Sequence, residues 1–577
     1  MPELIICIIL YIIFGGKILV KAARNIAHGE IFDENFLMCV ASLGSFVMGE
    51  YDEAVMVMAL YRIGEWLQNK AIGKSRKSIG ALMDIMPAYA NLNGKKVSPD
   101  DLHVGDIIEI KPGERIPADC IIESGTSRID TAALTGEALP AFVEPGMDLY
   151  SGSINLEGLL IAKVVKVASE STASRILELV EEAADNKAKA ENFITKFARV
   201  YTPIVCGLAV VCGLIPPILG LGPWKMWIHR ALTFLIISCP CALVISIPLA
   251  FFGGIGGASS KGILIKGGNY LETLSKVKTV VFDKTGTLTR GVFKVIAVHP
   301  HDCDEDKLLE LAALAESFSN HPIARSLADA YGQKIDKVRV SDFREIPGKG
   351  VLAKVDGKHV AAGNRKIMEH IGCEYHDCDH PGTRVHVALG GDYMGHVIIS
   401  DEIKEDAKTA VESLKTSGLE PVMLTGDKED VAKETAKELN IEKYRYDLMP
   451  EDKLKIVEEI IKPVEKLAFV GDGINDAPAL ARADIGIAMG AMGSAAAVEA
   501  ADIVLMNDKP SDVALAISHS KRVMKIIYQD IVFSLGVKVI VLIASALGYS
   551  PMWMAVFADV GVCLLAILNS MRTLKVK

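Results

Sequence analysis

Asp283-Lys284-Thr285-Gly286-Thr287-Leu288-Thr289 is the stretch that decides the fold of this chain. It follows an apolar, β-branched run, Val277 to Phe282, which predicts a buried strand. An aspartate at the tip of such a strand lies where open α/β sheets bind their ligands. Gly286 allows the backbone to turn close to a phosphate, and a carboxylate can accept a phosphoryl group covalently. The stretch therefore predicts an α/β domain in which Asp283 is the phosphoryl acceptor.

Two more strand tips carry polar residues that suit the same chemistry. They are Thr425-Gly426-Asp427 and Gly471-Asp472-Gly473-Ile474-Asn475-Asp476, and each follows a short apolar run. The Thr425 hydroxyl can bind phosphoryl oxygens, and Lys453 can offset their charge. Asp472 is a hard oxygen ligand that suits Mg²⁺, and Asn475 can help to complete the shell of the ion. These tips converge only if the sheet is parallel, which the alternation of strands and helices favours.

The hydrophobic residues are gathered in blocks rather than spread along the chain. They make up 50% of the 577 residues, and the mean hydropathy is +0.30, which is high for a soluble protein. Long charged segments separate the blocks, which predicts a membrane protein with large aqueous domains. We expect seven spans, at about 3–20, 35–50, 53–68, 203–221, 228–257, 531–548 and 551–570. The net charge of −10, without a dense Lys/Arg tract, argues against nucleic acid as a partner.

The hydrophilic segments differ in their patterns. Residues 75–195 hold short β-like runs separated by Gly and Pro, which predicts a small β-rich domain. Residues 262–525 alternate strands and helices, which predicts a doubly wound α/β domain with an inserted α+β lobe. The expected boundaries are 1–74 for the first spans, 75–195 for the β-rich domain, 196–261 for the middle spans, 262–291 with 398–525 for the α/β domain, 292–397 for the lobe, and 526–577 for the last two spans.

Taken together and in this order, the stretch at 283–289 and the residues of the other two strand tips resemble the P-type ATPases, ion pumps that pass through an aspartyl-phosphate. The resemblance implies a helical membrane bundle, a β-rich actuator domain, a Rossmann-type phosphorylation domain of the haloacid-dehalogenase class and a small nucleotide-binding domain. It implies ATP as the energy source and Mg²⁺ as the cofactor. The magnesium ligands would be Asp283, Thr285 and Asp472, and the other catalytic candidates are Lys284, Thr425, Lys453, Asn475, Thr135, Gly136 and Glu137. Glu137 would position the water that hydrolyses the aspartyl-phosphate.

The inserted lobe carries residues that resemble the nucleotide site of the heavy-metal pumps. A Glu, a His-Pro pair and a Gly-x-Gly hold the adenine end of ATP in those pumps. The corresponding residues here are Glu316, His321, Gly348 and Gly350, with Thr425, Gly426 and Asp427 at the phosphate end.

Four soft ligands, Cys373, His376, Cys378 and His380, lie close together in the sequence of the same lobe. Such residues can bind zinc. Their spacing is not that of a standard zinc finger, and the segment has the composition of a surface loop. We therefore favour an ordinary loop and leave zinc binding as the alternative.

Cys239-Pro240-Cys241 lies inside the fifth expected span. Proline lacks a backbone donor, so it breaks the helix and frees carbonyl groups at membrane depth. Breaks of this kind mark binding sites in transporters. Because thiolates select Cu(I), Zn²⁺ and similar ions over Na⁺, K⁺ or Ca²⁺, the motif predicts a site for a soft or borderline metal.

Two charged residues lie within the last apolar spans. A charge at the bilayer centre costs roughly 2.5–3.5 kcal/mol on insertion scales, so Lys538 and Asp559 indicate function. We expect Asp559 to bind the metal with Cys239 and Cys241, and its hard oxygen favours Zn²⁺ over Cu(I). Lys538 would be the counter-ion of Asp559 in the empty site.

The sequences around Lys538 and Asp559 resemble the zinc/cadmium/lead subgroup of the heavy-metal pumps. The resemblance implies ATP-driven export of Zn²⁺, Cd²⁺ or Pb²⁺ by a monomeric pump in the plasma membrane, with its catalytic domains in the cytoplasm. Glu53, at an outer hairpin, would accept the departing metal. Two departures from the subgroup are Asp530, where an Asn is usual, and Cys563, one helical turn after Asp559. The alternatives are a Cu(I) exporter, a non-pumping metal sensor and a soluble phosphatase, although the last does not explain the apolar spans.

Positive charge sets the expected orientation of the spans. Lys70, Lys74 and Arg76 follow the third span, and Arg572 and Lys575 follow the last, so both places should be cytoplasmic. Heavy-metal pumps usually have eight spans. We therefore expect that this chain lacks the first of them, with a true seven-span variant as the alternative. The paired glycines at 15–16 predict a kink in the first helix.

Overall fold

A computed structural model of the chain describes residues 2–27, 34–83, 87, 89–131, 140–174, 189–237, 241–319, 321–376, 378, 382–461, 465–472, 476–490, 499–546, 549 and 552–576. The chain divides into two compact units. The first is Met1–Lys276 with Leu515–Lys577, and the second is Val277–Ala514.

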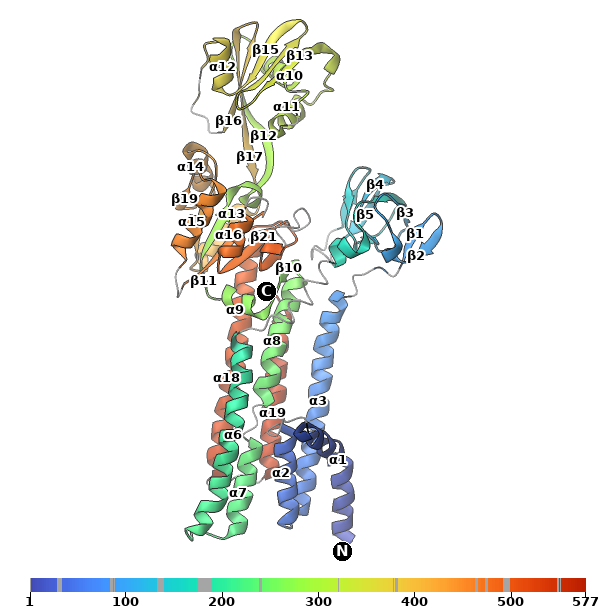
Figure 1. Cartoon of the computed structure of the whole chain (residues 1–577), viewed down its shortest axis with the longest axis vertical. Helices are drawn as coiled ribbons and strands as arrows, with labels where there is room; N and C mark the ends of the chain where they lie inside the picture. The colour runs from blue at the N-terminus through green and yellow to red at the C-terminus, as the bar shows by residue number, and fades with distance from the viewer. Residues whose placement is uncertain are drawn as a thin grey trace. The chain divides into compact units, whose positions relative to one another are not determined.

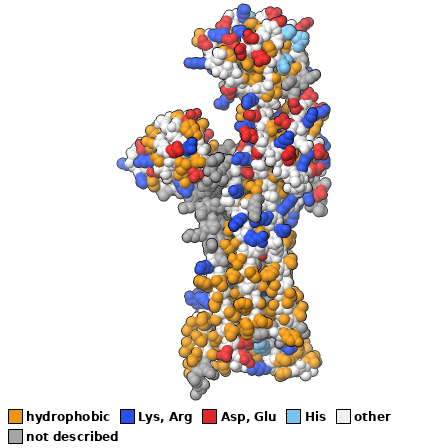
Figure 2. Space-filling view, turned by 180° about the vertical axis from the view of Figure 1, so that it is seen from behind, with side chains coloured by type: hydrophobic (Ala, Val, Ile, Leu, Met, Phe, Trp, Pro, Cys, Tyr) orange, Lys and Arg blue, Asp and Glu red, His pale blue; other side chains and the backbone are white. Residues whose placement is uncertain are grey.

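Long helices make up most of the first unit (Figure 1). They are α1 (Pro2–Ala27), α2 (Glu34–Val47), α3 (Tyr51–Met83), α6 (Lys189–Ile218), α7 (Trp224–Ile237), α8 (Cys241–Ser259), α18, which begins in the other unit (Ser511–Ala546), and α19 (Met552–Ser570). Large apolar side chains on these helices are exposed, among them Ile13 at 66% and Ile540 at 67%. Figure 2 shows hydrophobic side chains covering this part of the molecule. Such a surface is stable against lipid rather than water.

Within the described residues, four stretches are long and apolar enough to cross a membrane. They are Leu4–Ala27, Trp224–Ser259, Ser511–Ser545 and Trp553–Leu574, and Phe36–Val47 and Cys206–Ile218 are shorter apolar helices. The expected third span lies in α3, whose acidic and basic residues make it less apolar than these. The expected fifth span, 228–257, falls within Trp224–Ser259, and residues 238–240 inside it lie outside the described residues. The kink expected in α1 stays a prediction.

The β-rich domain of the first unit is built from short antiparallel strands. One sheet has the order β2-β1-β3-β9-β4-β7, and a second has the order β6-β5-β8. The strands are β1 (Ala90–Leu92), β2 (Lys95–Val97), β3 (Ile107–Ile110), β4 (Cys120–Ser124), β5 (Ser127–Asp130), β6 (Ala141–Val143), β7 (Asp148–Leu149), β8 (Ile154–Asn155) and β9 (Leu160–Val164). Alternate residues of β3 and β9, such as Ile108, Ile110 and Leu160, are buried in one core, as the period of two along a strand requires. The same unit also contains β10 (Ile263–Ile265) and α9 (Gly268–Leu274).

A parallel sheet forms the centre of the second unit. Its strand order includes β22-β21-β20-β11-β18-β19. These are β11 (Val277–Asp283), β18 (Glu420–Leu424), β19 (Lys443–Arg445), β20 (Lys466–Gly471), β21 (Ile485–Met489) and β22 (Ile503–Leu505), and α13 (Ala407–Thr416), α14 (Glu429–Glu438), α15 (Pro450–Ile460) and α16 (Ala477–Arg482) lie between them in the chain. Strand β11 lies between β18 and β20, and its side chains Val281 and Phe282 are fully buried. The predicted α/β class is confirmed.

An antiparallel lobe is inserted between β11 and β18. Its sheet has the order β12-β17-β16-β15-β14-β13. The elements are β12 (Thr289–Pro300), α10 (Glu305–Ala315), α11 (Pro322–Tyr331), β13 (Val340–Ile346), β14 (Gly350–Val355), β15 (Lys358–Gly363), α12 (Arg365–Ile371), β16 (Thr383–Leu389) and β17 (Asp392–Ile403). Strands β12 and β17 pair from Thr289 opposite Ile403 to Pro300 opposite Gly395. This two-stranded ribbon joins the lobe to the parallel-sheet domain (Figure 1).

Candidate functional site

The C-terminal ends of neighbouring parallel strands bring the predicted phosphoryl-transfer residues together. Asp283 ends β11 and pairs in register with Leu424, the residue before Thr425. Phe282 pairs with Val470 of β20, two residues before Asp472. Because parallel strands all end at one edge of the sheet, segments that are distant in the sequence meet there.

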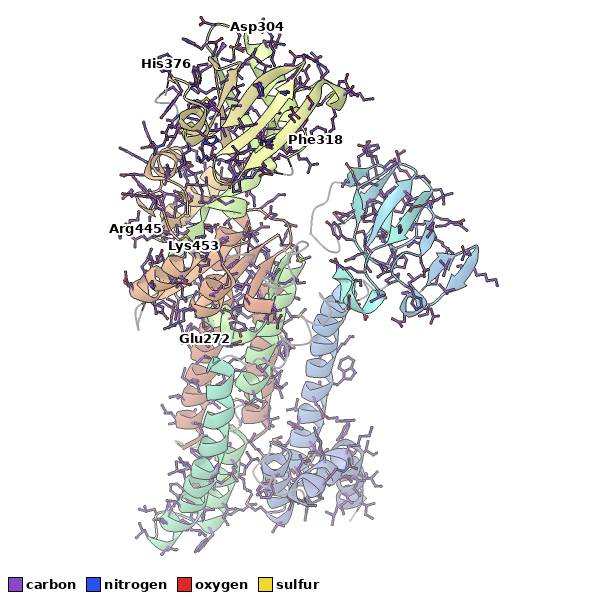
Figure 3. The ribbon with its side chains drawn as sticks, turned by 45° about the horizontal axis from the view of Figure 1, so that its top comes forward. Glu272, Asp304, Phe318, His376, Arg445 and Lys453 are labelled. Atoms are coloured by element: carbon purple, nitrogen blue, oxygen red, sulfur yellow. The ribbon has the colours of Figure 1, made fainter. Side chains whose placement is uncertain are left out.

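Asp283 is buried in an ion-pair cluster. The residue is 4% exposed, and the Lys453 Nζ lies 2.5 Å from Asp283 Oδ1 and 2.9 Å from Asp476 Oδ1. Lys453 comes from α15 (Figure 3), and Asp476 precedes the first turn of α16. Two residues that the sequence singled out, Asp283 and Lys453, are therefore in direct contact.

The negative charge in this cluster exceeds the positive charge. Burial and the neighbouring Asp476 carboxylate raise the pKa of Asp283 and the Lys453 ammonium lowers it, with a net value of about 7. Asp472 also contributes to the rise. Three carboxylates around one ammonium form a hard-oxygen donor set with uncompensated charge, which is the kind of site that Mg²⁺ prefers.

The loop after Asp283 is held close to Asp472. Gly286 has φ +72°, and a Cβ atom on it would lie 2.8 Å from Asp472 Oδ2. A glycine is required here for both reasons, since other residues rarely adopt this backbone conformation and their side chains would collide with the carboxylate. Thr285, the other expected magnesium ligand, lies in the same loop.

Charged residues that the sequence did not reveal as important hold this loop in place. The Lys404 Nζ donates to the Gly286 carbonyl oxygen at 3.0 Å and pairs with Asp508 at 2.8 Å. The Thr289 hydroxyl donates to the Lys284 carbonyl oxygen at 2.9 Å and contacts Asp401. Asp401 and Lys404 lie at the end of β17, and only the fold shows that this end reaches the loop after Asp283.

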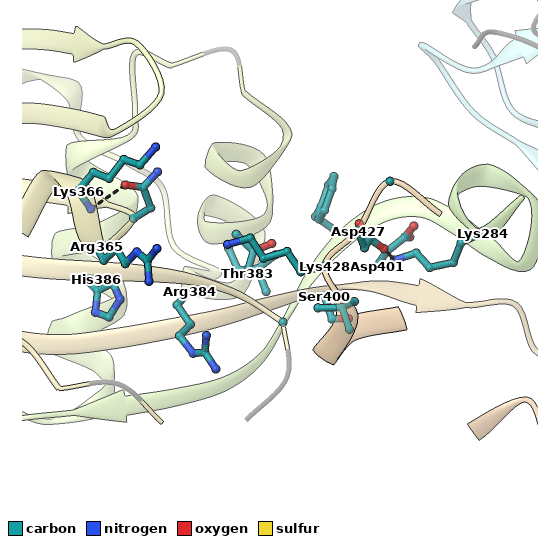
Figure 4. A pocket seen from close by; sticks show the side chains of 16 residues that line it. Lys284, Arg365, Lys366, Thr383, Arg384, His386, Ser400, Asp401, Asp427 and Lys428 are labelled. Atoms are coloured by element: carbon teal, nitrogen blue, oxygen red, sulfur yellow. Dashed lines mark hydrogen bonds and ion pairs between the residues drawn. The ribbon is translucent and has the colours of Figure 1, made fainter. Parts of the chain in front are cut away.

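A cavity of about 520 Å³ extends from this loop into the inserted lobe (Figure 4). Lys284, Gly426 and Asp427 line one part of it, and the Lys284 Nζ pairs with the Asp427 carboxylate. Thr425 is buried, and its hydroxyl accepts a hydrogen bond from the Asp427 N–H at 3.0 Å. Sequence reasoning missed the other cations that line the cavity, which are Arg365, Lys366, Arg384 and Lys428. A cavity lined by five cations and two carboxylates suits a polyphosphate chain.

The residues expected at the adenine end lie elsewhere in the lobe. Among the described residues that line the cavity, none is Glu316, His321, Gly348 or Gly350. Burial raises the pKa of Glu316 to about 7, and the His321 Nδ1 accepts a hydrogen bond from the Ile323 N–H at the start of α11. Gly350 of β14 lies opposite Gly363 of β15. A Cβ atom on Gly350 would lie 2.2 Å from the Ala362 carbonyl oxygen, so the close approach of the strands requires a glycine here. Their nucleotide-binding role stays a prediction.

In the membrane helices, Lys538 and Asp559 are paired as expected. The Lys538 Nζ lies 2.6 Å from Asp559 Oδ1 and donates to the Ile237 carbonyl oxygen at 3.1 Å. Ile237 is the last described residue of α7. Because Ile237 is two residues before Cys239, the ion pair lies beside the expected metal motif.

Asp530 and Cys563, the two residues that depart from the zinc/cadmium/lead subgroup, have different surroundings. Asp530 accepts hydrogen bonds from the Asn569 side chain at 2.9 Å and the Ser570 hydroxyl at 2.8 Å, so it links α18 to α19. Cys563 is fully buried and packs against Ala242 and Leu249 of α8.

Glu53, the expected release residue, has a partner that the sequence did not indicate. The His229 Nε2 lies 2.8 Å from Glu53 Oε2 and links α7 to α3. Glu50 pairs instead with Lys225 at 2.8 Å, with both side chains exposed. Glu53 and His229 together offer one oxygen and one nitrogen ligand, which is a suitable pair for a zinc-class ion.

Several expected site residues lie outside the described residues. These are Thr135, Gly136, Glu137, Asn475 and Cys239, and only the backbone of Cys241 is described. Strands β5 and β6, which precede and follow 132–139, pair antiparallel with Ile129 opposite Ala141.

Comparison with known proteins agrees with this arrangement. Residues 277–484 match the haloacid dehalogenase-like hydrolase family, and residues 87–181 match the P-type ATPase actuator domain. The chain is 51% identical over 577 residues to the cadmium, zinc and cobalt-transporting ATPase of Bacillus subtilis, covering 98% of this chain and 82% of that one. It is 49% identical over 582 residues to the zinc-transporting ATPase of Synechocystis sp., covering 99% and 81%. A solved zinc-transporting PIB-type ATPase in the E2.Pi state matches with a TM-score of 0.63 and 36% identity, over 99% of this chain and 95% of that one.

Replacing Lys453 with Met should shift the pH dependence of phosphoenzyme formation, if Asp283 is the phosphoryl acceptor that the sequence predicts. A protonated Asp283 cannot attack a phosphorus atom, and burial already raises its pKa to about 7. Loss of the ammonium raises that pKa further. A rise of about one unit takes the ionised fraction at pH 7 from about one half to about one tenth, so we expect a roughly fivefold or larger loss of phosphoenzyme. Part of this loss should recover as the pH rises. Acid-quenched labelling with ATP carrying a radioactive γ-phosphate measures both effects.

Lys415→Met is the matched control, since Lys415 pairs with Glu442 on the surface. It should keep the wild-type profile. An unchanged pH midpoint in Lys453→Met would contradict the electrostatic role given to Lys453.

Proposed function

We propose a division of roles among the residues of this chain on the premise that it belongs to the zinc- and cadmium-transporting P-type ATPases. It is an ATP-driven exporter of Zn²⁺ and Cd²⁺ and a multi-pass membrane protein with its catalytic domains in the cytoplasm. ATP and Mg²⁺ are its cofactors. Transport of Pb²⁺ and action as a monomer are further parts of the proposal.

The observation that carries the catalytic assignment is the buried contact between Asp283 and Lys453 at the tips of parallel strands. In the proposed step, an Asp283 oxygen attacks the γ-phosphorus of ATP, the bond from that phosphorus to the β–γ bridging oxygen breaks, and ADP leaves. Lys453 holds the carboxylate ionised and in position. Lys284 and the cavity cations Arg365, Lys366 and Arg384 offset the charge of the phosphate chain. Asp283, Thr285 and Asp472 would hold Mg²⁺, which supplies further charge compensation when bound.

Hydrolysis of the aspartyl-phosphate is assigned to Glu137 on the strength of the resemblance of its loop. The Glu137 carboxylate would accept a proton from a water molecule as the water attacks the phosphorus. The bond between phosphorus and the Asp283 oxygen then breaks, which releases phosphate and restores the carboxylate.

The transport site is assigned to Cys239, Cys241 and Asp559, with Lys538 as a built-in counter-ion. The Lys538–Asp559 pair and its bond to the Ile237 carbonyl support this assignment. An ammonium at this position neutralises Asp559 when no metal is bound, which lowers the cost of keeping the carboxylate in the membrane. A metal ion then competes with Lys538 for the same oxygen, so binding and release require the ammonium to move.

Glu53 and His229 are proposed to receive the metal after it leaves the transport site. Their 2.8 Å contact is half-buried, whereas the nearby Glu50–Lys225 pair is exposed. A carboxylate and an imidazole bind zinc more weakly than a site with two thiolates, so they allow the ion to depart.

A Cu(I) exporter and a non-pumping metal sensor make different predictions. The carboxylate of Asp559 argues against Cu(I), which prefers thiolate and thioether ligands. The buried Asp283–Lys453 contact argues against a sensor, because sensing needs no phosphoryl-transfer site.

Asp559→Asn should abolish the stimulation of ATP hydrolysis by Zn²⁺, since the amide carries no charge to bind the metal or to balance Lys538. We expect a loss of at least ~10-fold in the zinc-stimulated rate, because removing a charged ligand typically costs more than 1.4 kcal/mol. The measurement is phosphate release by purified protein reconstituted in lipid and titrated with Zn²⁺, Cd²⁺ and Cu⁺.

Asp530→Asn is the matched control for this variant. It makes the same change at a buried carboxylate of α18 that lies outside the proposed site, and its partners Asn569 and Ser570 can also bond to an amide. It should keep the stimulation. Full zinc stimulation in Asp559→Asn would exclude Asp559 as a ligand, and stimulation of the wild type by Cu⁺ alone would favour the Cu(I) exporter.

Glu53→Gln should slow turnover without preventing phosphorylation. If Glu53 receives the departing metal, its loss retains the metal in the transport site and the aspartyl-phosphate accumulates. We expect a several-fold higher steady-state level of phosphoenzyme together with a lower zinc-stimulated rate. Glu50→Gln, at the exposed neighbouring pair, should change neither quantity, and equal behaviour of the two variants would contradict the assignment.

A further inference from the structure

Three histidines form a row across adjacent strands of the inserted lobe. His299 on β12 lies directly opposite His396 on β17, and His396 lies directly opposite His386 on β16. Residues opposite one another in an antiparallel sheet point to the same face. Neighbouring rings have centroids 5.0 Å and 5.5 Å apart. Figure 2 shows histidine side chains gathered on one flank of this lobe.

A cysteine from another segment reaches this row. The Cys378 Sγ lies 3.0 Å from the His396 Nε2. One ligand atom from each of His299, Cys378 and His396 lies within 4.8 Å of the other two. His396 is buried, whereas His299 and Cys378 are partly exposed, so an ion has a route from solvent.

Tyr393 orients His396 so that the correct nitrogen faces Cys378. The Tyr393 hydroxyl donates to the His376 carbonyl oxygen at 3.1 Å, and it lies 2.9 Å from His386 Nδ1 and 3.0 Å from His396 Nδ1. A phenol has one hydrogen and two lone pairs. Since the Tyr393 hydrogen bonds to the His376 carbonyl, His386 and His396 must each donate their Nδ1–H to the Tyr393 oxygen. The Nε2 of His396 then carries a lone pair, which is directed at Cys378. A hydrogen bond that fixes the tautomer of a ligating histidine is a regular part of metal sites.

The distances suit a zinc-class ion with only side-chain adjustment. Bonds of about 2.0 Å to nitrogen and 2.3 Å to sulfur place tetrahedral ligand atoms roughly 3.3–3.6 Å apart. The His396–Cys378 separation of 3.0 Å must therefore open slightly. The other separations, none above 4.8 Å, must close by about 1.5 Å at most.

This grouping differs from the one that the sequence indicated. Cys373 is buried in an apolar cluster with Ile367 and Met368, and the ring of His376 packs against that of His301 with centroids 5.1 Å apart. His380 lies outside the described residues. Of the four soft ligands named from the sequence, Cys378 is the one that the described structure places in a group of three side chains able to hold one metal ion.

We propose that His299, Cys378 and His396 form a second binding site for a divalent cation of the zinc class, in the inserted lobe and separate from the membrane site. One sulfur and two nitrogen donors select Zn²⁺, Cd²⁺ or Co²⁺ over Mg²⁺. The thiol loses its proton when the metal binds, and a water molecule takes the fourth position. The site does not rest on the transport assignment, because it shares no residue with it.

The site is close to the cavity proposed to hold the phosphates of ATP. His386 lines that cavity, and it shares the Tyr393 hydroxyl with His396. A metal on His396 is thus two hydrogen bonds away from the cavity wall. The site also joins β12 to β17, the two strands that connect the lobe to the parallel-sheet domain.

Counting the zinc ions bound by the full chain tests this proposal. Equilibrium dialysis against Zn²⁺ should find one ion fewer per chain in His299→Ala and in Cys378→Ser than in the wild type. Cys303→Ser is the matched control, since Cys303 is a half-buried free thiol of the same lobe outside the cluster, and it should hold the wild-type number. Phosphoenzyme formation from ATP by each variant reports that the protein is folded.

Titration with Co²⁺ adds a readout that identifies the ligand. Each thiolate bound to Co²⁺ gives charge-transfer absorption, so Cys378→Ser should lose part of this absorption while Cys303→Ser keeps all of it. The proposal is overturned if both cluster variants bind as much Zn²⁺ as the wild type and give its full Co²⁺ spectrum. The cluster would then be a hydrogen-bonded group that packs the edge of the sheet.

Discussion

The structure depends on one constraint, the burial of the Asp283 carboxylate among other carboxylates with a single lysine to balance them. Asp283, Asp472 and Asp476 meet because β11 and β20 run parallel and end at the same edge of the sheet. Lys453 contacts two of them. Burial and, after it, the remaining excess of negative charge raise the pKa of Asp283. A site with this charge attracts cations, and the basic cavity beside it attracts the phosphate chain that Asp283 is proposed to attack.

The same physical arrangement recurs in the membrane. Asp559 is another carboxylate in a costly environment, and Lys538 neutralises it at 2.6 Å. Removing Lys538 alone would leave an uncompensated charge, whereas exchanging it for a metal ion would not. At both sites a buried aspartate is paired with a lysine before its ligand binds. The transported metal is proposed to replace Lys538 at Asp559, and Mg²⁺ is proposed to add to the charge of Lys453 at Asp283.

A site residue could be predicted from the sequence when its immediate neighbours along the chain indicated its role. The strand tips at Asp283, Thr425 and Asp472 were recognisable because an apolar run precedes each of them, and the fold class and family followed from them. Arg384, Lys404 and His229 were missed because only the register of distant strands and helices brings them to a site. Cys378 was grouped with its sequence neighbours, but its partners His299 and His396 are supplied by β12 and β17. Cross-strand pairs of this kind have no signal in a single sequence.

The most direct test of the central claim is zinc transport by the full chain in sealed proteoliposomes, with the ATP-binding domains facing out. On addition of ATP and Mg²⁺, radioactive zinc should accumulate inside the vesicles, and Asp283→Asn should show no accumulation although it binds zinc as the wild type does. If the wild type hydrolyses ATP in response to zinc without accumulating it, or if Asp283→Asn still accumulates zinc, then the buried aspartate does not drive transport and this account is contradicted.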